Sequence, residues 1–167
     1  VQEEAARSFG AGGIFMERCI TDARHIEVQL LVNAEGESFA LGVRDCSIQR
    51  RNQKVIEEAP SPILPEDVEQ LLRRSAAEMA RLANYRGVGT AEFLYQPHTG
   101  VSTFLEVNSR LQVEHTITEY VLGCDLVEAQ IDTVHGIPWS PETTTPIGHA
   151  IELRVNAENP ERGFQPS

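Results

Sequence analysis

The 167-residue sequence lacks the features of several large protein classes. No apolar run approaches the ~20 residues that span a bilayer, and residues 1–4 do not open a signal peptide. We therefore expect a cytoplasmic protein without a membrane segment. The formal net charge of −11 argues against a general affinity for nucleic acid or anionic lipid, while leaving room for a local cationic pocket.

Cysteine and lysine are both scarce. Cys19, Cys46 and Cys124 are widely spaced and form no metal-ligand motif, so we expect buried, reduced thiols. Of the 14 lysine and arginine residues, Lys54 is the only lysine. A compact ammonium and a planar guanidinium are not interchangeable at a tight anion site. We therefore favour a functional Lys54 over a chance surface lysine.

The glycines form no recognisable phosphate-binding loop. Gly87 and Gly89 lack the GxGxxG spacing and the following helix of a dinucleotide-binding loop, and no P-loop pattern is present. The residues alone therefore do not predict nucleotide binding.

Hydrophobic periodicity predicts one compact α+β domain, a mostly antiparallel sheet with flanking helices. The predicted strands cover residues 14–19, 26–33, 38–43 and 147–157, with a further hairpin over 88–108. Residues 47–58 are predicted to be extended or looped. The predicted helices cover residues 1–9, 65–83, 117–122 and 125–135.

Polar side chains alternate with other residues from position 106 to position 114, and an extended strand would place them on one face. They are Glu106, Asn108, Arg110, Gln112 and Glu114. A hairpin over residues 88–108 would also bring Glu92 close to Glu106. Two carboxylates and an amide oxygen suit Mg²⁺. The alternative is an edge strand with a solvated polar face.

Four segments follow one another along the chain: residues 24–29 (RHIEVQ), 44–60 (RDCSIQRRNQKVIEEAP), 104–115 (FLEVNSRLQVEH) and 148–158 (GHAIELRVNAE). Together they resemble the biotin carboxylases, which are the ATP-grasp components of biotin-dependent carboxylases. The resemblance implies the C-terminal portion of an ATP-grasp domain, with residues 1–167 forming a partial domain. The family's N-terminal domain, glycine-rich lid and C-terminal part would lie outside it.

By this resemblance, the intact protein uses ATP, Mg²⁺ or Mn²⁺, and bicarbonate to carboxylate biotin through carboxyphosphate. Its partners would be a biotin carboxyl carrier domain and a carboxyltransferase component, and it would form a homo-oligomer. We expect an acyl-CoA carboxylase of the acetyl or propionyl type. A urea or pyruvate carboxylase and a non-catalytic ATP-grasp remnant are the alternatives. The isolated chain should be inactive, because the family's lid and phosphate-binding lysines belong upstream of it.

The resemblance also implies roles for individual residues. The metal ligands would be Glu92, Glu106 and Asn108. The catalytic residues would be Glu114 as general base, Arg110 for the biotin enolate and Lys54 for bicarbonate. The residues that bind nucleotide or bicarbonate would be Glu17, Arg18, Cys19, Ile20, His25, Gln49, Asn52, Gln112, Val113 and Arg154.

Two of these assignments have an alternative interpretation, and a third residue differs from the family. A lone His25 beside a strand is often purely structural, and Arg154 could form an ordinary salt bridge at a strand end. Asn52 departs from the family, which often has histidine there. Asparagine can bind a ribose hydroxyl but cannot stack or carry charge, so we expect a different affinity for ATP.

Overall fold

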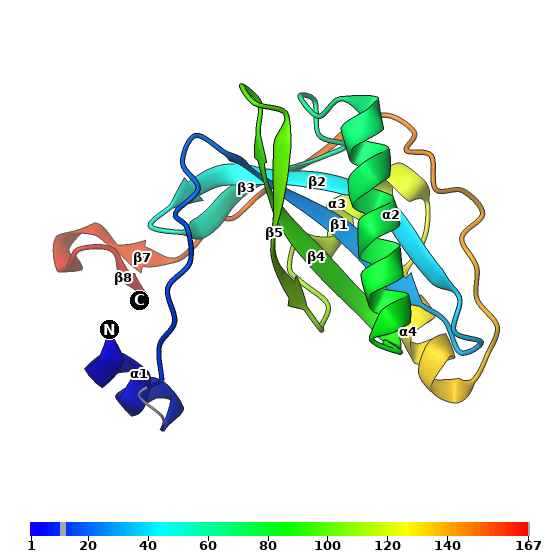
Figure 1. Ribbon diagram of the computed structural model, residues 1–167, viewed down its shortest axis with the longest axis horizontal. Helices are drawn as coiled ribbons and strands as arrows, with labels where there is room; N and C mark the ends of the chain where they lie inside the picture. The colour runs from blue at the N-terminus through cyan, green and yellow to red at the C-terminus, as the bar shows by residue number, and fades with distance from the viewer. Residues whose placement is uncertain (11–12, 167) are drawn as a thin grey trace.

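A six-stranded sheet organises the chain, whose computed structural model describes residues 1–10 and 13–166 (Figure 1). The strand order is β5-β4-β1-β2-β3-β6, and all neighbouring strands are antiparallel. The strands are β1 (Arg24–Val32), β2 (Ser38–Arg50), β3 (Gln53–Ala59), β4 (Gly87–Gln96), β5 (Val101–Asn108) and β6 (Ala150–Leu153). The helices are α1 (Gln2–Phe9), α2 (Glu66–Leu82), α3 (His115–Leu122) and α4 (Leu126–His135). A C-terminal hook contains β7 (Glu158–Asn159), the 3₁₀ helix η1 (Pro160–Arg162) and β8 (Gln165–Pro166).

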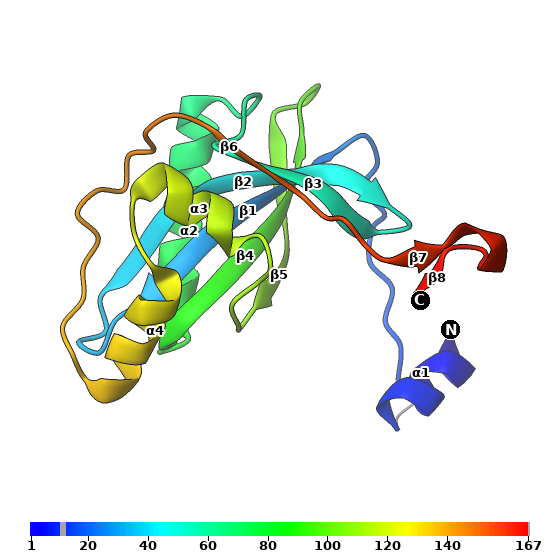
Figure 2. The ribbon, with the colours of Figure 1, turned by 180° about the vertical axis from the view of Figure 1, so that it is seen from behind.

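Helices cover both faces of the sheet, with α2 on one face and α3 and α4 on the other (Figures 1 and 2). Strand alternation sorts the side chains of β1 between these layers. Ile26 and Val28 belong to the apolar cluster under α2. Glu27 and Gln29 point the other way and share Arg44 with a side chain of α3. All five of these residues are fully buried, so the α3 side of the sheet contains a polar interior.

A bulge in β2 changes this alternation. Between two positions paired with β1, β2 contains one extra residue. Gly42 lies in this stretch with a φ of 98°, a conformation that only glycine adopts at little cost. As a result Leu41 and Arg44 both face α3, whereas Val43 packs under α2. The bulge thus directs the Arg44 guanidinium into the polar interior.

Most of the predicted elements are confirmed, including the α+β class and the antiparallel sheet. The two predicted hairpins are β1–β2 and β4–β5, and the four predicted helices are α1 to α4. Residues 47–58, predicted to be extended or looped, contribute to a third hairpin, β2–β3. Its turn residues Arg51 and Asn52 have φ values of 53° and 63°. Among the described residues, no helix is both long and apolar enough to cross a membrane.

Two predicted strands are wrong in whole or in part. Residues 14–19 form no strand, because the segment 13–21 pairs with no other strand among the described residues. Phe15 and Met16 in this segment are 82% and 96% exposed. The last strand covers only residues 150–153 of the predicted 147–157, which is the stretch that pairs with residues 56–59 of β3.

The predicted continuous face from position 106 to position 114 is also wrong. β5 ends at Asn108, and the chain then turns into α3, where His115 N–H donates to the Gln112 carbonyl. The expectation of buried cysteines holds for Cys46, but Cys124 is half-buried and Cys19 is exposed. Cys19 is exposed because it lies in the unpaired segment 13–21.

Candidate functional site

One lysine lies among three buried glutamates on the α3 side of the sheet. Lys54 Nζ is 2.8 Å from a Glu114 oxygen and 3.1 Å from a Glu92 oxygen, and it also contacts Glu27. Glu27 and Glu92 are cross-strand neighbours on β1 and β4, and Glu114 directly precedes α3 without capping it through its side chain. Burial opposes the charge on Lys54, but Glu27 and Glu114 raise its pKa above the ordinary value. The ammonium therefore offsets part of the repulsion within the acidic cluster.

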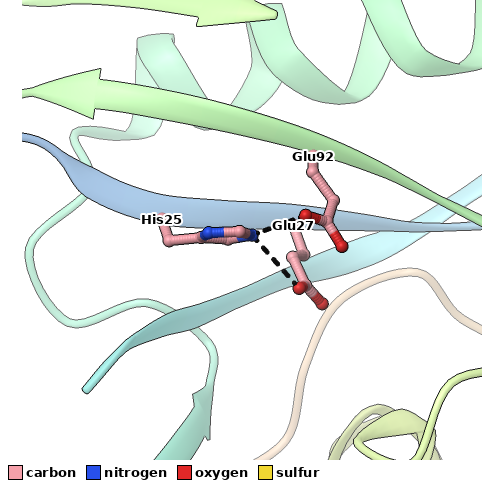
Figure 3. A group of neighbouring side chains, drawn as sticks. All are labelled: His25, Glu27 and Glu92. Carbon is pink, nitrogen blue, oxygen red and sulfur yellow. Dashed lines mark ion pairs between the residues drawn. The ribbon is translucent and has the colours of Figure 1, made fainter. Parts of the chain in front are cut away.

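His25 points toward two of these glutamates, Glu27 and Glu92 (Figure 3). It lies two residues before Glu27 on β1, so both side chains leave the same face of the strand. His25 Nε2 is 2.8 Å from a Glu92 oxygen and 3.4 Å from a Glu27 oxygen (Figure 3). Burial alone would lower the pKa of His25, but the two carboxylates outweigh it and raise that pKa to about 9. We therefore treat His25 as an imidazolium at neutral pH.

Arg44 binds the cluster from the interior of the protein, through Glu27. Its guanidinium is fully buried and donates to side chains from β1, β4, α3 and the segment before α3. Two of its nitrogens lie 3.0 and 3.2 Å from the same Glu27 oxygen. Its other partners are Gln29, Thr90, Gln112 and Thr118. Burial raises the pKa of Glu27, yet His25, Arg44 and Lys54 lower it well below the ordinary value.

Glu114 lies between two cations. One of its oxygens is 2.8 Å from Lys54 Nζ, and the other is 2.9 Å from a guanidinium nitrogen of Arg154. The same guanidinium donates to Glu57 over 2.6 Å. Arg154 follows β6, where its backbone N–H still bonds to Val55 of β3. Glu114 is only 2% exposed. Lys54 of β3 and Arg154, which follows β6, hold its carboxylate in place through these hydrogen bonds.

The three predicted metal ligands lie together at the β4–β5 hairpin. Glu92 pairs directly with Glu106, and Asn108 Nδ2 is 2.8 Å from Glu92 and 3.5 Å from Glu106. A bulge at Leu105 adds one residue to β5 and lets Leu105 and Glu106 line the same pocket. The donor set of two carboxylates and one amide oxygen fits Mg²⁺, provided that the Asn108 amide turns its oxygen toward the ion.

Two adjacent pockets open over these groups. The first has a volume of about 310 Å³ and the second of about 480 Å³. The residues lining the first are Arg51, Asn52, Gln53, Lys54, Arg110, Gln112, Val113, Glu114 and Arg154. The residues lining the second are His25, Gln49, Asn52, Lys54, Glu92, Leu94, Leu105, Glu106, Asn108, Arg110 and Gln112. Most of the residues predicted for the site are therefore gathered around one divided cavity.

Four predicted residues are placed elsewhere. Glu17, Arg18, Cys19 and Ile20 lie in the segment 13–21 and line neither pocket. The first three are exposed, and Ile20 is half-buried. The adjacent carbonyl of Thr21 accepts a hydrogen bond from the Gln96 side chain. The structure therefore gives no geometric support to these four as site residues.

Three charged residues of the site were not predicted as such. Glu27 and Arg44 both lie in segments that resemble the family, and each has an apolar residue directly before it in its strand. A charge within a predicted strand is itself a signal, since it requires a partner of opposite sign if the strand is buried. Glu57 gave a weaker signal, because it lies among the charged residues from Arg50 to Glu58.

We expect Lys54 to resist acylation in the folded chain. Its raised pKa reduces the fraction of free amine, by roughly tenfold for each pKa unit. Mass spectrometry after timed treatment with an amine-selective reagent should show at least tenfold slower labelling than in urea-unfolded chain. The amino group of Val1, which is 89% exposed, is an internal control. Equal labelling rates in the folded and unfolded states would contradict the buried ion cluster.

The same arrangement of elements occurs in known proteins. Residues 1–140 match the family described as carbamoyl-phosphate synthase L chain, ATP binding domain. The chain is 45% identical to biotin carboxylase 1 of Bacillus subtilis, over 99% of this chain and 37% of that protein. It is 48% identical to urea amidolyase of Saccharomyces cerevisiae, over 100% of this chain and 9% of that protein.

A solved structure is also similar. The biotin carboxylase domain dimer of Hydrogenobacter thermophilus 2-oxoglutarate carboxylase, in complex with MgADP, ADP and bicarbonate, superposes with a TM-score of 0.90. It is 40% identical, and the match covers 99% of this chain and 37% of that one. The chain thus covers at most 37% of the length of these relatives.

Proposed function

Because this chain belongs to the family of the carbamoyl-phosphate synthase L chain ATP-binding domain, among its biotin carboxylases, we propose that it supplies the acid–base and bicarbonate-binding groups of a biotin carboxylase. The single observation that carries this proposal is the position of Glu114 between Lys54 and Arg154 at the wall of a 310 Å³ pocket. The two cations can attract an anion into the open pocket, and the carboxylate between them can take a proton from that anion.

We propose that bicarbonate binds in this pocket against Lys54, Arg110 and Arg154, with the segment of Gln112 and Val113 beside it. Each oxygen of the Glu114 carboxylate has a second lone pair beyond the one that its cation engages. Glu114 then takes the proton of the bicarbonate hydroxyl, and the bicarbonate oxygen attacks the γ-phosphate of ATP. The bond between the γ- and β-phosphates breaks, and the products are ADP and carboxyphosphate, which decomposes into CO₂ and phosphate beside biotin.

The neighbouring 480 Å³ pocket is the proposed place for the nucleotide phosphates. His25, Gln49 and Asn52 line it and can donate to phosphate or ribose oxygens. Glu92, Glu106 and Asn108 would hold Mg²⁺, which when bound neutralises charge on the phosphate oxygens. Arg110, whose exposed side chain lines both pockets, would stabilise the biotin enolate by its positive charge. Adenine contacts by Glu17, Arg18, Cys19 and Ile20 remain part of the proposal through the family alone.

We propose acetyl-CoA or propionyl-CoA as the final acceptor of the carboxyl group. Urea and pyruvate are the alternatives, since a urea amidolyase and a pyruvate carboxylase are each 48% identical to the chain. This choice depends on a carboxyltransferase component that acts after the biotin step. Assaying the intact protein with each acceptor in turn distinguishes them, because only the true acceptor sustains ATP turnover beyond one equivalent of biotin.

The intact carboxylase should hydrolyse ATP only when bicarbonate and biotin are both present, whereas the isolated 167-residue chain should be folded and inactive. Phosphoryl transfer requires a tightly positioned γ-phosphate, and the chain alone offers one open wall of that site. Phosphate release measures the ATP hydrolysis of both proteins, and circular dichroism tests whether the isolated chain is folded. Bicarbonate-dependent hydrolysis by the isolated chain, or a disordered spectrum, would contradict the expectation.

A non-catalytic remnant is the second candidate function. Calorimetric titration of the intact protein with MgATP distinguishes a biotin carboxylase from a remnant, since a remnant with a decayed site would release no heat. The cluster of Lys54, Glu92 and Glu114 favours a working site. Both carboxylates are buried and Lys54 is half-buried, and charged groups placed inside a protein cost stability, which a decayed site would have no reason to keep.

A further inference from the structure

A separate pocket of about 400 Å³ lies at the far end of β2 from Lys54. Ser38, Phe39 and Ala40 begin β2, whereas Gln49 near its other end pairs with Lys54. At ~3.3 Å per residue, the ten residues from Phe39 to Gln49 separate the two places by roughly 30 Å. The residues lining this pocket are Ser38, Phe39, Ala40, Gln70, Arg73, Arg74, Ala77 and Thr144. It shares no residue with the cavity around Glu114.

The charge of this pocket is opposite to that of the whole chain. Arg73 and Arg74 of α2 both line it, and none of its lining residues is acidic. The chain as a whole carries a formal net charge of −11. Glu69 lies 3.5 Å from Arg73 and offsets part of its charge, but Arg74 has no ion-pair partner among residues 1–10 and 13–166. Arg74 therefore presents an unpaired guanidinium at the pocket.

The walls of the pocket are held by hydrogen bonds between three separate segments. Arg73 donates to the Ala40 carbonyl over 2.9 Å and to the Thr144 carbonyl over 3.2 Å. The Ser38 hydroxyl donates to the Ala77 carbonyl over 3.1 Å. β2, α2 and the segment before β6 are thereby fixed around the pocket before any ligand arrives, which lowers the entropic cost of binding.

Part of the lining is apolar. Ala40 of β2 and Ala77 of α2 line the pocket. Phe39 also reaches it, although its ring packs edge-on against Trp139 in the cluster on the α3 side, with ring centroids 5.8 Å apart. A cavity of this size with apolar lining and a few polar groups is typical of small-molecule sites, which measure roughly 300–1,000 Å³.

We propose that this pocket binds a small organic anion, whose carboxylate or phosphate group pairs with Arg74 and whose apolar part lies against the apolar lining. A guanidinium forms a planar, two-pronged bond to either group. The bound anion contacts β2, α2 and residue Thr144 together, and so stabilises the long segment 136–149 against the sheet. This site is independent of the activity proposed above, because it uses none of the same residues.

The test uses inorganic phosphate and succinate as separate probes, with sodium chloride at matched ionic strength as the reference. Amide chemical shifts of the ¹⁵N-labelled chain follow Phe39, Ala77 and Thr144, which distinguishes this pocket from any anion bound near Lys54. Phosphate binding alone identifies a phosphorylated ligand, and succinate binding alone a carboxylate ligand. Either result, with saturable shifts, supports the site.

The variant Arg74→Gln should weaken binding of the effective probe by about tenfold or more, as expected for losing a charged hydrogen bond. Arg81→Gln is the matched control, because Arg81 lies on the same helix, is exposed and pairs with Glu78 outside the pocket. It should bind as the wild type does. Absence of saturable shifts with both probes, or equal weakening by the two substitutions, would overturn the proposal.

Discussion

Replacing Arg44 with methionine should lower the free energy of unfolding by about 3–5 kcal/mol, the cost of breaking a buried ion pair on one side. Methionine fills much of the same volume but leaves the Glu27 oxygen without its two guanidinium donors. It also leaves the Gln29 and Gln112 oxygens without a donor in the interior. Urea unfolding followed by circular dichroism measures the loss.

The control for this substitution is Arg81→Met on the exposed face of α2, which should change stability by no more than about 0.5 kcal/mol. The double variant Arg44→Met, Glu27→Gln also removes the unpaired charge of Glu27. Its loss of stability should be ~0.5–3 kcal/mol smaller than the sum of the losses of the two single variants. A loss below about 1 kcal/mol in Arg44→Met would show that the guanidinium is not needed to hold the acidic cluster.

Glu114→Gln in the intact carboxylase should reduce the rate of bicarbonate-dependent ATP hydrolysis by about 10²–10⁴-fold, the usual contribution of a positioned general base. Glutamine keeps the shape of the side chain and can still accept from Lys54 or Arg154, but it cannot take the bicarbonate proton. The KM for ATP should change little, because Glu114 does not line the proposed nucleotide pocket.

Glu78→Gln is the matched control, since Glu78 is exposed on α2 and pairs only with Arg81. It should retain full activity. A Glu114→Gln variant that keeps more than a tenth of the wild-type rate would assign the base to another residue. A large rise in the KM for ATP would instead indicate that Glu114 organises the nucleotide pocket.

Local patterns predicted the elements well, because each depends on neighbours in the sequence. The 17-residue helix α2 follows from its apolar spacing, and the β4–β5 hairpin from the turn between two alternating runs. The pairing of Glu92 with Glu106 follows from that hairpin. These predictions needed no knowledge of distant contacts.

The parts that the sequence did not predict all depend on distant residues. Lys54 meets Glu27 from 27 positions away, and Arg44 meets Gln112 from 68 positions away. Periodicity assigns a side chain to a face but does not say which strand lies beside it. The segment 14–19 has the apolar residues of a strand, yet no neighbouring strand within the described chain pairs with it.

The extra residue at Gly42 makes the faces of β2 depend on the backbone of one glycine. Leu41 and Arg44 are three positions apart, and a regular strand would place them on opposite faces. A substitution at Gly42 strains its φ of 98° and favours a regular strand, in which Arg44 would turn toward the apolar layer under α2 and Glu27 would lose its counter-charge. Deleting the extra residue would instead leave Leu41 and Arg44 two positions apart and keep both on the α3 side. Related chains should therefore either keep a glycine at this position or lack the residue altogether.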